Sequence, residues 1–66
     1  MTRALFLSAL KDGLAGMPES ERADIMADYE AHFADGTAAG RSETDIEASL
    51  GDPARLAKEL NAEAGL

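Results

Sequence analysis

Three polar residues at helical spacing are the first candidates for chemistry in this sequence of 66 residues. Asp28 and His32 stand four positions apart, so on a helix their carboxylate and imidazole could share a divalent cation, and Asp35 follows in the next turn. Zinc, however, normally takes three or four protein ligands, and His32 is the only histidine in a chain without cysteine. We therefore predict no metal site. His32 is expected to lie between core and solvent, steadied by Asp28 or Asp35.

The segment 35–42, DGTAAGRS, has the glycines of a calcium loop without its ligands. It lacks the alternating Asp or Asn ligands at the first, third and fifth positions and the bidentate Glu at the twelfth. Positive backbone φ at Gly36 and Gly40 would instead let one helix reverse into the next. We expect a turn here and no calcium.

Covalent catalysis finds little support in the residue types. None of the four serines has an adjacent base, and the single histidine is distant from all of them in the sequence. Carboxylates are plentiful, but so short a chain rarely encloses a pocket large enough for a substrate. It also has no glycine-rich phosphate loop. We therefore predict no catalytic residue, no cofactor and no enzyme activity.

Composition and hydrophobic periodicity predict the elements that position these residues. Alanine is abundant, β-branched residues are few and proline occurs twice, which favours helix throughout. Helices are expected over residues 2–14, with Thr2 as the N-cap, over 18–35 or slightly beyond, and in two shorter segments that begin near 42 and 52. Leu5 lies off the apolar stripe, either as an exposed side chain or as a contact for another molecule.

The predicted fold class is all-α, a compact bundle of four helices (two longer, two short) that forms a single domain over residues 1–66. The apolar side chains recur every three or four positions, so they share one face of each helix. The expected inward set is Phe6, Leu7, Leu10, Leu14, Met17, Ile25, Met26, Tyr29, Phe33, Ile46, Leu50, Leu56 and Leu60.

Helix ends are expected at residues whose backbone or side chain suits them. Gly16 and Gly36 are expected to end the first and second helices in the left-handed conformation, and Pro18 fits the first turn of the second helix. Ser42 forms a box-like N-cap with Asp45 in place of the usual Glu or Gln. The remaining turning and capping residues are Gly40, Gly51, Asp52 and Pro53.

The second helix has three faces rather than two. Beside its inward stripe runs an acidic stripe of Glu21, Asp24, Asp28 and Asp35. Nearly opposite the core lie Ala23, Ala27, Ala31 and Ala34. The alanines are either good helix formers on a solvated face or a ridge that lets another helix approach closely. The acidic stripe either keeps the domain soluble or steers a basic partner.

The net charge of −7, from thirteen acidic and six basic side chains, repels nucleic acid phosphates and anionic membranes. The third and fourth helices resemble a helix-turn-helix in outline, but their basic side chains are offset by Glu59 and Glu63. The longest apolar run, residues 4–7, is far too short to span a bilayer, and the first residues do not form a signal peptide. We expect no direct nucleic acid partner, and membrane attachment only through a segment absent from this sequence.

Several short sequence motifs follow one another along the chain in a recognisable order. They are MPESER (17–22), YEAHF (29–33), Gly36, SETDI (42–46) and LGDP (50–53). Each phrase is weak alone, but their order and spacing make the chain resemble the bacterial HAAS signalling domain over nearly its whole length. Met17 stands where that family usually has leucine, a departure that costs the packing little.

The resemblance implies an all-helical cytosolic domain, usually N-terminal to transmembrane helices or another output segment. Such proteins are often encoded beside a PadR-like winged-helix transcription regulator and are thought to signal with it. The resemblance implies no catalytic residue. We expect the domain in the cytoplasm, or at the cytosolic face of the inner membrane as part of a longer protein. Continuation beyond Leu66 and a stand-alone member both remain open.

These observations favour an interaction module over a catalyst. We expect a non-catalytic protein-interaction domain of bacterial signal transduction, with a PadR-like winged-helix regulator as its partner. The expected contact surface comprises Asp24, Ala27, Asp28 and Ala31. The alternative is a self-associating dimerisation module, and a DNA-binding helix-turn-helix comes third.

Overall fold

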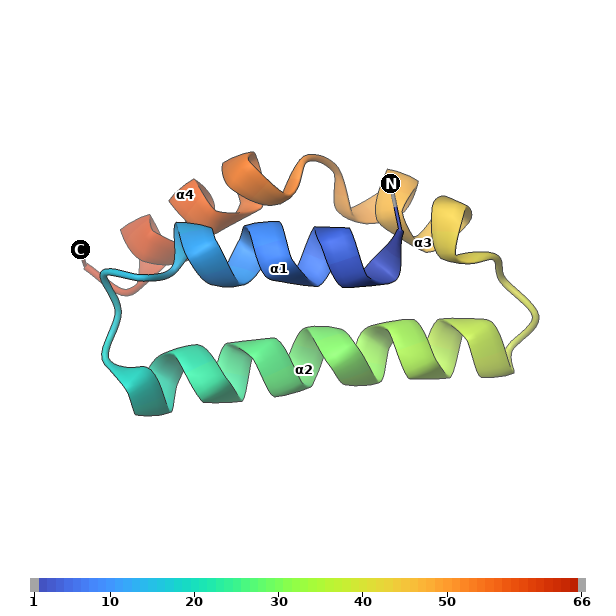
Figure 1. Ribbon diagram of the computed structural model, residues 1–66, viewed down its shortest axis with the longest axis horizontal. Helices are drawn as coiled ribbons and strands as arrows, with labels where there is room; N and C mark the ends of the chain where they lie inside the picture. The colour runs from blue at the N-terminus through green and yellow to red at the C-terminus, as the bar shows by residue number, and fades with distance from the viewer. Residues whose placement is uncertain (1, 66) are drawn as a thin grey trace.

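Four α-helices follow one another along residues 2–65, the part of the chain that the structure, a computed structural model, describes. They are α1 (Arg3–Gly13), α2 (Glu19–Ala38), α3 (Glu43–Leu50) and α4 (Pro53–Glu63). The predicted all-α bundle is confirmed, and the described residues contain no strand. In Figure 1, α2 runs antiparallel to α1, α3 lies near the start of α1, and α4 returns beside α1. Leu66, beyond which the chain either continues or ends, lies outside the described residues.

Side-chain caps begin three of the helices at the predicted residues. Thr2, Ser42 and Asp52 each accept a hydrogen bond from the backbone N–H three residues on, at 3.1–3.2 Å. Each bond satisfies an amide that has no partner within its own helix. Pro53 is the first residue of α4, where its missing N–H is not needed. Pro18 precedes α2 instead of lying in its first turn, because its ψ of 144° is extended.

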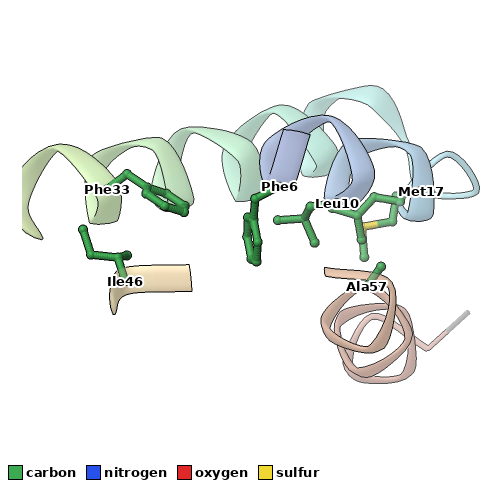
Figure 2. Packing of buried hydrophobic residues seen from close by; sticks show 7 residues of the cluster. Phe6, Leu10, Met17, Phe33, Ile46 and Ala57 are labelled. Carbon is green, nitrogen blue, oxygen red and sulfur yellow. The ribbon is translucent and has the colours of Figure 1, made fainter. Parts of the chain in front are cut away.

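The core forms around α1, which contacts each of the other three helices. The rings of Phe6 and Phe33 meet edge to face with their centroids 5.5 Å apart, and Ile46 lies beside Phe33 (Figure 2). The buried hydrophobic residues are Phe6, Leu10, Leu14, Met17, Phe33, Ile46 and Ala57. The rest of the expected inward set is partly buried against them. Leu5 remains 60% exposed, off the apolar stripe as expected.

Gly16 and Gly36 do not take the expected left-handed conformation, because the described residues with positive φ are Gly40, Gly51 and Gly65. Helix α1 already ends at Gly13, and α2 continues through Gly36 to Ala38. Gly36 faces α3 instead, where an added Cβ would stand 2.5 Å from Cδ1 of Ile46. It is therefore a residue of close helix approach. Gly40, with φ of 88°, turns the chain towards α3 as predicted.

Helix α1 is held closely at both ends. At its C-terminal end, a Cβ on Gly13 would stand only 2.5 Å from Cβ of Ala57, so α1 and α4 meet there almost backbone to backbone. The Nδ2 group of Asn61 donates a hydrogen bond of 3.0 Å to the Gly13 carbonyl at the same crossing. At the other end, the Arg3 amide donates to Oε1 of Glu43 over 3.2 Å. These contacts fix where α3 and α4 stand against α1.

We expect Gly13→Ala to destabilise the domain, because the new methyl group has no room beside Ala57. Overpacking costs roughly 1–3 kcal/mol, and the better helix propensity of alanine returns at most about 1 kcal/mol. The free energy of unfolding in urea, followed by circular dichroism, should fall by about 1–2 kcal/mol. Gly16→Ala is the matched control, since nothing lies within 4 Å of its added Cβ. Equal stability of the two variants would contradict the close crossing.

A second pair of substitutions tests the contact between α2 and α3. Gly36→Ala alone should destabilise the domain, because its methyl group meets the δ-methyl of the buried Ile46. Ile46→Val removes that methyl group at a cost of roughly 0.5–1.5 kcal/mol. The double variant should therefore be more stable than the sum of the single effects predicts, by about 0.5 kcal/mol or more. Simple additivity in urea unfolding would show that the two positions do not touch.

Candidate functional site

The residues expected to bind a partner all lie on the exposed side of α2. Asp24, Ala27, Asp28 and Ala31 are open to solvent, and their spacing of three and four positions keeps them on one face. They do not share a hollow, because Ala27 lines a depression on one side of the helix and Asp28 lines another on the opposite side. The structure therefore places the expected contact surface on a helical ridge between two depressions.

The first depression, the α1–α2 recess, has a volume of about 320 Å³ and a lining of mixed charge. It is lined by Lys11, Glu19, Arg22, Ala23, Met26, Ala27 and Glu30. Because two cations and two carboxylates stand together here, the recess favours neither sign of ligand.

The second depression, the α2–α4 groove, has a volume of about 310 Å³ and an apolar floor. Ile25 and Tyr29 of α2 and Leu60 of α4 are half-buried there, so part of each side chain remains open to solvent. Asp28 and His32 complete the lining from α2. Both helices pack against α1, and direct contacts between α2 and α4 are few. The groove is thus a partly uncovered extension of the core.

The negative charges of carboxylates on both helices act on the Tyr29 hydroxyl at this groove. Burial raises the pKa of Tyr29 above its ordinary value, and nearby negative charges raise it further, in the order Glu63, Asp28 and Glu59. Glu59 also forms an exposed ion pair with Arg55, at 3.5 Å from Nε to Oε1, which contributes little in solvent. Asp28, Glu59 and Glu63 therefore form what we call the acidic rim of the groove, beside its apolar floor.

His32 lies at the edge of the groove and is exposed, so it does border the core and solvent. Its expected support is absent: among residues 2–65, no hydrogen bond or ion pair joins His32 to Asp28 or Asp35. No group of three or more His, Asp or Glu side chains in the described chain could hold a metal ion. The polar triplet on α2 is thus a set of exposed side chains on a helix surface.

The conspicuous aromatic pair of α2 has two different roles. Phe33 is buried against Phe6, and the guanidinium carbon of Arg3 stands 5.9 Å from the centre of its ring. Tyr29, one turn earlier, faces the groove.

The burial of Glu47 in α3 is another feature that the sequence patterns do not predict.

The acidic rim is the part of the site that sequence reasoning missed. Glu59 and Glu63 are visible in the sequence only as charges that offset nearby Arg55 and Lys58. Their i, i+4 spacing indicates one face of α4, but no sequence signal indicates that this face meets Tyr29. That meeting depends on how α4 packs against α1.

Comparison with known proteins places the chain in context. A family model described as HAAS matches residues 5–59 of the 66. No curated protein and no solved structure matches the chain. Among the described residues, no helix combines the length and apolar character needed to cross a membrane. The match includes the α2 side of the groove, whereas Leu60 and Glu63 on α4 lie just beyond it.

The ionisation of Tyr29 tests the acidic rim directly, since Tyr29 is the only tyrosine in a chain without tryptophan. Its tyrosinate absorbance should appear at a higher pH in the folded protein than in the urea-unfolded chain, where the pKa is about 10. Glu63→Gln should move the folded midpoint back towards that value, because Glu63 exerts the largest of the charge effects. A folded midpoint at or below the unfolded one would contradict this arrangement.

The same shift predicts how stability depends on pH. Because the folded state keeps the phenol proton to a higher pH than the unfolded chain, Tyr29 leaves the free energy of unfolding unchanged below about pH 10. Above that pH the free energy of unfolding should fall until the folded-state pKa is passed. Tyr29→Phe should remove this alkaline decrease in urea unfolding measured at a series of pH values.

Proposed function

Because the chain belongs to the HAAS family, we propose that it is a non-catalytic protein-interaction module of bacterial signal transduction. Its partner is a PadR-like winged-helix transcription regulator, and it acts as the cytosolic domain of a larger membrane protein. Family membership is the observation that carries this proposal, since HAAS domains are associated with regulators of that kind. The regulator, and not this domain, would then contact DNA.

The surface chemistry of α2 supports an interaction role. Small side chains at Ala27 and Ala31 allow the backbone of another helix to come close, and Asp24 and Asp28 flank them with negative charge. With a net charge of −7, the domain attracts basic protein surfaces and repels nucleic acid phosphates. These properties suit a contact with a DNA-binding protein, whose own surface is basic.

Affinity capture from a lysate of the source bacterium tests the proposal. The wild-type domain should retain a winged-helix regulator that mass spectrometry identifies. Ala31→Arg should reduce retention about tenfold, because it puts a long cationic side chain on the contact face. Ala48→Arg, an exposed position on α3, is the matched control that makes the same change of charge on another helix.

Two results would contradict the proposal. If the wild-type domain retains no regulator, the regulator hypothesis fails. Sedimentation at rising concentration then decides whether the alternative, self-association, takes its place. If Ala31→Arg unfolds the domain, the alanine face is not a free surface, because an exposed substitution should change the free energy of unfolding by no more than about 0.5 kcal/mol.

A further inference from the structure

The α2–α4 groove is the place where this small core remains incompletely covered. Ile25, Tyr29 and Leu60 come from two helices that pack on α1 and barely touch each other. Their half-buried side chains form a depression of about 310 Å³ that opens to solvent. Another apolar side chain placed there would bury the remaining exposed surface of all three.

The charges around this floor have one predominant sign. Asp28 lines the groove from α2, and on α4 Glu63 follows one turn after the lining residue Leu60, so each helix carries a carboxylate beside the apolar floor. Arg55 pairs with Glu59 and partly offsets it. Burial is the main cause that raises the pKa of Tyr29, and the negative charges of Glu63, Asp28 and Glu59 raise it further. An occupant of complementary chemistry therefore carries an apolar stripe flanked by cations.

We propose that the α2–α4 groove binds a cationic amphipathic helix of the partner protein. An apolar side chain of that helix packs between Ile25, Tyr29 and Leu60, while its Lys and Arg side chains contact Asp28 and Glu63. This inference rests on the proposed interaction function and specifies the partner segment and the place where it binds. This binding place is a different surface from the ridge of Ala27 and Ala31, which faces away from the groove.

The charges and shape of the groove favour this occupant over others. A second copy of the chain would bring its own net charge of −7 against an acidic rim, and an anionic ligand would meet the same repulsion. The volume of about 310 Å³ is at the lower limit for a small-molecule site. The lining comes from two turns of α2 and from Leu60 of α4, so the apolar floor lies between two helices, a surface that a third helix can cover.

A designed peptide serves as the probe. It forms an amphipathic helix of about four turns, with leucines at i, i+4 and i+7 and lysines on both flanks. In nitrogen-15 spectra of the folded domain, it should shift the amide signals of Ile25, Tyr29, His32 and Leu60 more than those of Ala23 and Ala27. A second peptide, with the leucines replaced by alanine at unchanged charge, should bind at least about tenfold more weakly in fluorescence anisotropy.

Substitutions of equal charge locate the contact. Asp28→Asn combined with Glu63→Gln should weaken binding of the leucine peptide about tenfold. Glu19→Gln combined with Glu30→Gln removes the same charge from α2 residues that line the α1–α2 recess on the other side of the helix, and should weaken binding by no more than about twofold. Equal effects of the two pairs would show non-specific attraction and overturn the proposal.

Other outcomes also overturn it. Signal shifts centred on Ala23 and Ala27 would place the binding site outside the groove. Equal affinity for the alanine and leucine peptides would show that apolar contacts do not contribute to binding. Shifts of the groove residues on concentrating the domain alone would identify a second copy as the occupant. Regulator capture that Ala31→Arg abolishes and the groove pair leaves intact would overturn this inference while keeping the proposed function. Peptide binding in the groove without any captured regulator would overturn the proposed regulator partner while keeping the groove as a site for a cationic helix.

Discussion

Helix α1 has to be covered by three helices at once, because its inward face carries a large part of the buried apolar surface. A chain of 66 residues has little surface to bury, so no alternative core can replace these contacts. The coverage requires very close approach: Gly13 meets Ala57 of α4, and Gly36 lets α2 meet Ile46 of α3. The fold therefore depends on positions where a side chain is absent as much as on the phenylalanine pair at its centre.

The same arrangement leaves α2 and α4 as neighbours without a shared interface. Each is fixed by its own contact with α1, and direct contacts between the two helices are few. Ile25, Tyr29 and Leu60 thus serve two purposes, as the outer layer of the core and as the floor of a groove. In so small a domain, the same side chains contribute to stability and remain partly exposed.

Charge gives this exposed apolar surface a preference. An uncovered patch on a neutral domain would favour indiscriminate association. Here the charges of carboxylates on α2 and α4 act on Tyr29, and the whole domain is acidic. Like-charged molecules are therefore kept apart, while a basic partner is attracted before contact. Ala27 and Ala31 of the α2 ridge face away from this groove, whereas Asp28 belongs to both, so the ridge and the groove are adjoining surfaces.

Local chemistry in the sequence is enough to predict the four helices, the caps at Thr2, Ser42 and Asp52, and the inward stripes, because each depends on neighbours within a few residues. The order of the short phrases likewise indicated the family that the HAAS match confirms. The prediction that Gly36 ends α2 was wrong, because only the position of Ile46 on α3 shows that this glycine allows a close approach of two helices. The acidic rim was missed for the same physical reason. The charge of Glu63 acts on Tyr29 only because both helices pack on α1, and no local pattern encodes the proximity of residues so far apart in the chain.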